Sequence, residues 1–146
     1  MKLQIEEGTA DKEPIVIIKC NAIDENIKKI SEYIKQYMVK ITCIKDGKTF
    51  QVPIDLVLYI DTVDNRTFVY CANEVYECKQ KLIYVEKELE HTPMVRISKN
   101  CLLNVSYLKS VEPFLNHRMK AQISNGEWLV VSRKYISTLK DKIMSK

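Results

Sequence analysis

Two short dipeptides constrain the fold of this chain more than any other feature of its sequence. Asp46-Gly47 and Asn125-Gly126 each stand between two runs of alternating apolar and polar residues. Asp-Gly and Asn-Gly pairs favour tight β-hairpin turns, because their residues tolerate the positive φ angles that such turns require. Each pair therefore predicts two antiparallel strands. The four predicted strands cover residues 39–45, 48–52, 120–124 and 127–131.

The same alternation predicts further strands throughout residues 39–146. Only two intervals there have the apolar spacing of a helix, at 80–90 and at about 133–144. Because strands outnumber helices, we predict a mainly β domain with small helices. The additional predicted strands cover residues 57–61, 67–71, 75–79, 94–98, 101–105 and 108–113.

Residues 1–38 are predicted to form a separate ββα element ahead of the domain 39–146. Its predicted parts are a strand at 3–6, a polar loop at 7–13, a strand at 14–20 and a helix over about 24–38. Asn21 or Asp24 is expected to cap the helix. The apolar residues of the helix form one stripe, which either packs on the neighbouring strands or forms a dimer seam. The stripe consists of Ile23, Ile27, Ile30, Ile34 and Tyr37.

The positive charge is concentrated in the C-terminal part of the chain. Residues 1–90 hold 13 Lys and Arg and 16 Asp and Glu, a net charge of −3. Residues 91–146 hold 10 Lys and Arg and 3 Asp and Glu, a net charge of +7. In the segments 94–104 and 131–135 the cationic side chains stand beside small polar ones at turns between strands. Such groups on strand ends suit contacts to phosphates and base edges, which predicts a nucleic-acid face; the alternative is an ordinary solvated surface.

Patterns for catalysis and metal binding are absent from the sequence. It has three glycines, none in a phosphate-binding loop, and two histidines, neither near a nucleophile pattern. We therefore expect no enzyme, no cofactor and no small-molecule substrate. Five cysteines without a Cys-x-x-Cys pair do not suggest zinc and fit a reducing, cytoplasmic compartment. The N-terminus lacks a signal-peptide pattern, and no apolar run approaches the roughly 20 residues of a membrane span.

Two alternatives to duplex DNA binding remain open at this point. The chain is also compatible with a protein-interaction module, in which strand edges and the helix at 24–38 hold a partner. An RNA-binding protein would need exposed aromatic residues on its strands, whereas we expect Tyr70, Tyr84 and Trp128 to be core residues. Binding that weakens steeply with salt would distinguish DNA from a protein partner.

Five segments in register make the chain resemble the LytTR family of bacterial transcription regulators, whose DNA-binding domain is mostly β. The resemblance runs from about Val39 to the C-terminus. The start of the chain is similar to that of short, stand-alone members. The five segments are Asp55 to Asp61, Arg66 to Tyr70, Leu82 to Leu89, Val95 to Val105, and Asn125 to Tyr135.

The resemblance implies small antiparallel sheets whose loops enter successive major grooves at direct repeats in promoter DNA. Arg133 is the strongest candidate for a base contact, because a guanidinium can bind guanine O6 and N7 together; its alternative role is a salt bridge at a helix start. Asn104 and Arg96 are expected to hold a turn rather than contact DNA. The implied contacts are Asp64, Asn65 and Arg66 in one loop, Ser98, Lys99 and Asn100 in a second, and Arg133 and Lys134 in a third.

The sequence departs from the family pattern in two respects. The family usually has His at the position of Ser98 and Ser at that of Asn100, which puts the preferred bases in doubt. Most members also carry a receiver domain ahead of this one, and residues 1–38 are too short for it, so we expect a stand-alone regulator. The resemblance further implies a homodimer on repeated half-sites and a small membrane protein as a regulatory partner.

Overall fold

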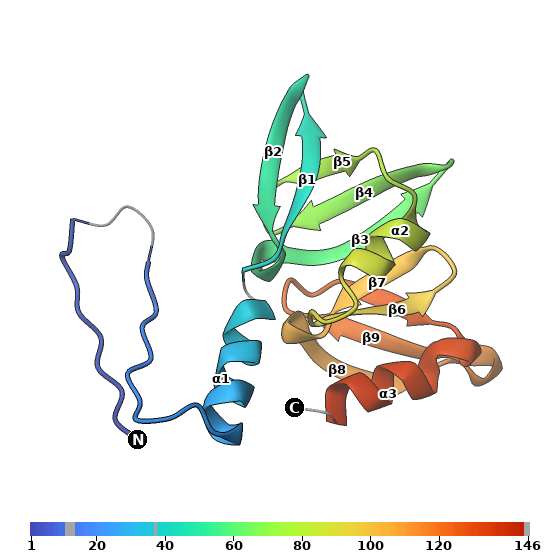
Figure 1. Ribbon diagram of the computed structural model, residues 1–146. Coiled ribbons are helices and arrows are strands. Elements are labelled where there is room, and N and C mark those ends of the chain that lie inside the picture. Colours follow the sequence, from blue (N-terminus) through green and yellow to red (C-terminus); the bar gives the residue numbers. More distant parts are fainter. Residues whose placement is uncertain (11–13, 37, 145–146) are drawn as a thin grey trace.

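The computed structural model describes residues 1–10, 14–36 and 38–144, and within them the chain is mostly β, as predicted. Seven strands form one antiparallel sheet and three form another (Figure 1). The larger sheet contains β1 (Lys40–Lys45), β2 (Lys48–Pro53), β3 (Val57–Val63), β4 (Arg66–Cys71), β5 (Val75–Cys78), β6 (Met94–Ser98) and β7 (Cys101–Asn104). The smaller sheet contains β8 (Leu108–Pro113), β9 (Met119–Ile123) and β10 (Trp128–Val131).

The helices are few and short. The α-helices are α1 (Glu25–Gln36), α2 (Leu82–Glu88) and α3 (Ile136–Met144), and the 3-10 turns are η1 (Ile54–Leu56), η2 (Val105–Tyr107), η3 (Leu115–His117) and η4 (Arg133–Tyr135). The strand order is β2-β1-β5-β4-β3-β7-β6 in the larger sheet and β10-β9-β8 in the smaller one. None of the described helices is both long and apolar enough to cross a membrane.

Both predicted hairpins form, although their turns differ. Asp46 and Gly47 have φ angles of 51° and 74°, the two positive values of a two-residue turn. At the second hairpin only Gly126 has a positive φ, of 91°. Ile123 N–H donates to Glu127 O over 3.0 Å, so three residues rather than two form this loop. Gly126 takes the left-handed position that a three-residue hairpin loop needs.

The buried apolar residues form two clusters, one under α2 and one between the two sheets. The first includes Val57, Val69 and Val85, which are fully buried between the larger sheet and α2. The second joins β6 and β7 to the smaller sheet and to α3, through Ile97 and Leu139 among others. The second cluster fixes the two sheets against each other and so positions the loops at their ends.

The N-terminal element differs from the prediction. α1 forms where expected, and Asp24 caps it by accepting a 2.9 Å hydrogen bond from Ile27 N–H. The two predicted strands are wrong: the described residues of 3–6 and 14–20 pair with no strand. A single two-stranded ribbon is only marginally stable in water, and here no sheet face covers its apolar side chains. Tyr37 and part of the predicted loop, residues 11–13, lie outside the described residues.

Two of the three aromatic residues predicted as core residues are exposed instead. Tyr84 is 60% exposed on α2 and Trp128 is 44% exposed on β10. Each belongs to an amphipathic element and lies on its outer side. Tyr70 is half-buried. All five cysteines are free; Cys43 and Cys78 are buried, Cys71 and Cys101 are half-buried, and Cys20 is exposed.

Candidate nucleic-acid interface

Hydrogen bonds place the first two predicted contact loops side by side. Asp64 and Asn65 form the tight β3–β4 turn, with φ angles of 51° and 62°. β7 pairs with β3 directly below this turn, and Thr62 N–H donates to Asn100 O over 2.9 Å. The turn between β6 and β7, which contains Lys99 and Asn100, therefore lies against the end of β3.

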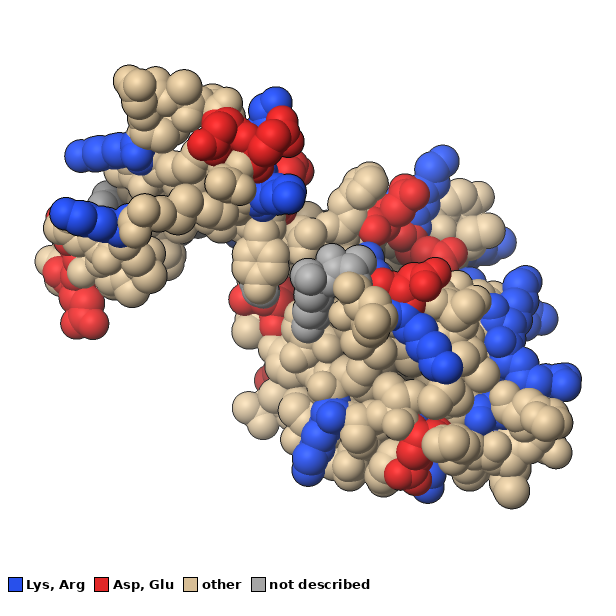
Figure 2. Space-filling view, turned by 90° about the horizontal axis from the view of Figure 1, so that it is seen from below, with Lys and Arg blue, Asp and Glu red and all other residues tan. Residues whose placement is uncertain are grey.

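A further hydrogen bond brings in the third loop. Ser132 N–H donates to Ile97 O over 2.8 Å, which holds the end of β10 beside the end of β6. Arg133 and Lys134 follow at once in η4 and are exposed. The three loops thus form a row at one end of the molecule, on the right in Figure 1. Lys and Arg side chains gather at the same end in Figure 2.

The cations of the second and third loops are available to a ligand. Lys99 is exposed, and the adjacent turn is fixed by a 3.3 Å hydrogen bond from Asn100 N–H to Ser98 Oγ. Lys134 Nζ lies 5.6 Å from the centre of the Tyr135 ring. Across the described ranges, none of Lys99, Arg133 and Lys134 forms an ion pair with a carboxylate. The helix-start salt bridge considered for Arg133 is therefore not seen.

Arg66 is engaged within the protein. Its Nε–H and Nη2–H donate to the two carboxylate oxygens of Glu77 on β5, over 2.9 Å and 2.7 Å. Its guanidinium carbon also lies 5.3 Å from the centre of the Phe68 ring. The hydrogen bond from Arg66 holds the pKa of Glu77 below its usual value. In the first loop the groups left for a ligand are consequently those of Asp64 and Asn65.

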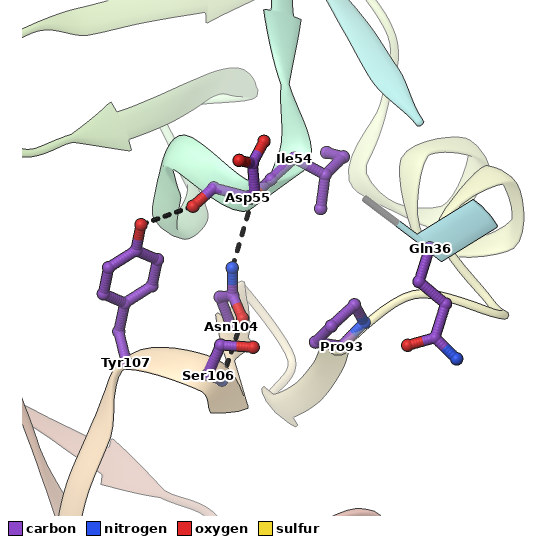
Figure 3. A pocket seen from close by; sticks show the side chains of 7 residues that line it. All are labelled: Gln36, Ile54, Asp55, Pro93, Asn104, Ser106 and Tyr107. Carbon is purple, nitrogen blue, oxygen red and sulfur yellow. Dashed lines mark hydrogen bonds between the residues drawn. The ribbon is translucent and has the colours of Figure 1, made fainter. Parts of the chain in front are cut away.

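Asn104 is buried at the end of β7 that lies away from the three loops, where it joins η1 to η2. Its Nδ2 donates to Val57 O over 2.8 Å and to Ile54 O over 3.3 Å, and its Oδ1 accepts from Ser106 N–H over 2.9 Å. Figure 3 shows this side chain beside a pocket of about 310 Å³ that Gln36, Pro93 and Tyr107 also line. The pocket brings together amide, hydroxyl and apolar groups and contains no pair of acids.

Arg96 also has a structural role. Its Nε lies 3.3 Å from Glu86 Oε2 on α2, and the side chain is largely covered. This ion pair joins β6 to α2. The Arg96 side chain is therefore not one of the cations that the row of loops presents to a ligand. Within the described ranges, the chain has no cluster of His, Cys, Asp and Glu able to hold a metal ion.

A polar cluster that the sequence did not reveal joins the two sheets behind the loops. Tyr59 on β3 donates its hydroxyl proton to Glu127 Oε2 over 2.9 Å, and its ring stacks on Tyr70 with centroids 4.4 Å apart. Burial raises the pKa of Tyr59, and it also raises the pKa of the Asp61 carboxyl two residues further along β3. The partners lie far apart in sequence, so only the folded chain brings them together.

Comparison with known proteins identifies one family. A model of the LytTr DNA-binding domain matches residues 47–144. The sensory transduction protein LytT of Enterococcus faecalis is 25% identical over 132 residues, which cover 83% of this chain and 54% of that protein. The transcriptional regulatory protein LytR of Staphylococcus aureus is 26% identical over 98 residues, which cover 67% of this chain and 40% of that protein. The chain spans about half the length of these relatives, or less.

A solved structure shows the same fold. The LytTr DNA-binding domain of a methyl-accepting/DNA response regulator from Bacillus cereus superposes with a TM-score of 0.67 at 23% identity. The superposition covers 72% of this chain and 96% of that domain. Residues of this chain within the superposition therefore have the fold of that domain.

Proposed function

The chain belongs to the LytTR family, a family of DNA-binding domains of regulators and not of enzymes, and from this premise we propose that it regulates transcription by binding specific promoter sequences. The observation that carries the proposal is the row of three loops, two of which present cations without carboxylate partners. The surface of B-DNA is polyanionic, so such a row supplies both affinity and orientation.

Each loop has a distinct part in the proposed complex. Arg133 contacts guanine in a major groove, because its planar guanidinium matches the O6 and N7 acceptors. Lys99 contacts a phosphate or a base in the second loop, where Ser98 and Asn100 shape the turn. Asp64 and Asn65 are suited to cytosine N4 and to adenine N6 and N7 at the first loop. The loops enter successive major grooves, and direct repeats place one copy of the protein on each half-site.

Selection from random duplexes, followed by salt titration, tests this proposal. Arg133→Ala is expected to weaken binding by about 1–3 kcal/mol and to relax preference at one base position. Lys99→Ala is expected to reduce the slope of log K against log salt by about one. Lys48→Ala is the matched control, because Lys48 is an exposed lysine at the tip of the β1–β2 hairpin, away from the loops (Figure 1).

The outcome that contradicts the proposal is a selection that enriches no sequence at moderate salt. Equal salt slopes for Lys99→Ala, Lys48→Ala and the unchanged protein would also contradict the assignment of the second loop. Partner binding without specific DNA binding would then favour the protein-interaction module.

We also propose that residues 1–38 associate with a second copy of the chain. The segment exposes large apolar side chains, among them Leu3 at 89%, Ile17 at 73% and Ile23 at 71%. This is more apolar surface than a chain leaves in water without a partner. Linking two DNA-binding domains, each bound to one of two repeated half-sites, raises the avidity for DNA without new contacts. A small membrane protein is the other partner proposed for this surface, from the resemblance alone.

Light scattering of the full chain and of a chain that starts at Val39 tests the dimer. The full chain is expected to be a dimer and the shorter one a monomer that binds repeated sites more weakly. The dimer proposal is wrong if both are monomers at high concentration and bind the repeats equally well.

A further inference from the structure

A fourth loop lies at the same end of the molecule as the three described above. β9 runs between β8 and β10, and its first residue, Met119, pairs with both Pro113 and Val131. The β8–β9 loop, residues 114–118, therefore lies at the same end of the smaller sheet as the last residue of β10. Arg133 follows β10 after one intervening residue, Ser132. Figure 1 shows this loop at the right-hand end of the smaller sheet.

The loop has a closed, well-defined conformation. Phe114 N–H donates to Arg118 O over 2.9 Å, and Arg118 N–H donates back to Leu115 O over 3.2 Å. Asn116 and His117 both have left-handed φ angles, of 58° and 61°. Two consecutive non-glycine residues in this region carry strain, which the loop's hydrogen bonds must offset. The conformation leaves Leu115 68% exposed, unusually open for a leucine.

Arg118 is held in place and yet retains free donors. Its Nε–H donates to Leu115 O over 3.1 Å, and its guanidinium carbon lies 5.1 Å from the centre of the Phe114 ring. Within the part of the chain that the structure describes, Arg118 forms no ion pair with a carboxylate. A guanidinium has five N–H donors, so all but the Nε–H remain for an acceptor from outside. Arg66, by contrast, gives two of its five N–H donors to Glu77 and is neutralised by that carboxylate.

We infer that the loop 114–118 is a fourth DNA contact, in which Arg118 binds a backbone phosphate and Leu115 packs against the adjoining sugars. This inference rests on the proposed function. The loop joins β9 and β8, which lie one and two strands from β10, about 5 and 10 Å at the usual strand spacing. Since one DNA strand advances about 3.4 Å per phosphate, the contact extends the footprint by about one to three nucleotides. Arg118 contributes affinity for any sequence, because a phosphate carries no base information.

Photocrosslinking tests the position of the loop. Benzoylphenylalanine in place of Leu115 is expected to form an adduct with a duplex that carries the selected site. The matched control is the same substitution at Ile83 on α2, since Leu115 and Ile83 are 68% and 63% exposed. Ile83 is expected to give no adduct. Both proteins keep every cation of the interface, so a difference between them reports proximity to DNA.

Salt titration tests the role of Arg118. Arg118→Ala is expected to reduce the salt slope by about 0.9 and to weaken specific and unrelated duplexes by the same factor. Arg118→Lys is expected to restore the slope, because it keeps the charge. Lys48→Ala again controls for the loss of one positive charge. Circular dichroism of each variant shows whether it is folded. If Arg118→Ala does not fold, the crosslink at position 115 alone decides whether the loop contacts DNA.

The outcomes separate this inference from the function on which it rests. If the unchanged chain binds no duplex in a salt-dependent way, the proposed function fails. If the unchanged chain binds DNA and Arg133→Ala weakens that binding, the proposed function stands. The fourth contact is then still overturned if the benzoylphenylalanine at position 115 forms no adduct. An unchanged salt slope in folded Arg118→Ala overturns it equally.

Discussion

Asn104→Ala is expected to lower the free energy of unfolding by about 2–3 kcal/mol, because it takes the Asn104 donor from the carbonyl of Val57 and one of two donors from the carbonyl of Ile54. The side chain is 1% exposed and donates to Val57 O over 2.8 Å and to Ile54 O over 3.3 Å. The short bond to Val57 accounts for most of the loss. The longer bond adds less, since the carbonyl of Ile54 also accepts from Val57 N–H and keeps that donor in the variant. Ser106 is exposed, so water replaces Asn104 as the acceptor for its N–H.

Asn104→Asp is the matched variant, because it keeps the shape and loses the donor. At pH 7 the introduced carboxylate faces two carbonyl oxygens, and it is expected to be more destabilising than the alanine. Only its protonated form can donate to Val57 O, so its pKa is raised in the folded state. The variant therefore keeps its stability below the unfolded pKa of about 3.9 and loses it as pH rises through the folded pKa.

Urea unfolding followed by the fluorescence of Trp128, the one tryptophan of the chain, measures these differences between pH 3 and 7.5. The structural role of Asn104 is refuted if the stability of Asn104→Ala lies within about 0.5 kcal/mol of that of the unchanged protein, the range of an ordinary surface substitution. It is also refuted if Asn104→Asp is no worse than Asn104→Ala at pH 7. DNA affinity should stay the same in the folded variants, and a loss of affinity alone would place Asn104 at the interface.

Three further predictions concern packing and charge, each checked by the same unfolding assay. Tyr59→Phe removes the 2.9 Å hydrogen bond to Glu127 and should cost about 1–2 kcal/mol; no loss would mean that this bond does not join the sheets. Leu139→Ala should cost about 2–5 kcal/mol, because Leu139 is 1% exposed between α3 and the sheets; a loss below 1 kcal/mol would mean a loosely packed α3. Burial raises the pKa of Asp61, so its ionisation costs stability as pH rises through that pKa. Asp61→Asn should therefore gain stability at pH 7 and not at pH 3, and an equal effect at both would exclude this cause.

The strands of residues 39–146 were predictable because their signals are local. The Asp46-Gly47 turn needs two positive φ angles and has them, and strand alternation follows from side chains on opposite faces. The runs at 3–6 and 14–20 carry the same alternation and β-branched residues, yet they form no strand. A strand needs a partner edge as well as a pattern, and no edge of the described sheets is paired with these runs. Local pattern therefore predicts the potential for a strand, and tertiary pairing decides whether it forms.

The same distinction explains what the sequence showed of the interface. The three loops follow from the order of the strands, which the family resemblance supplied. Whether an arginine in a loop is free depends on cross-strand register instead. Phe68 pairs with Glu77, which places Glu77 diagonally across from Arg66 and within reach of its guanidinium. Arg118 enters the row only because β9 lies between β8 and β10. A surface arginine counts toward a DNA interface when the neighbouring strand presents no acid to it. By that criterion the half-buried Arg118, which has no carboxylate partner among the described residues, is a better candidate than Arg66.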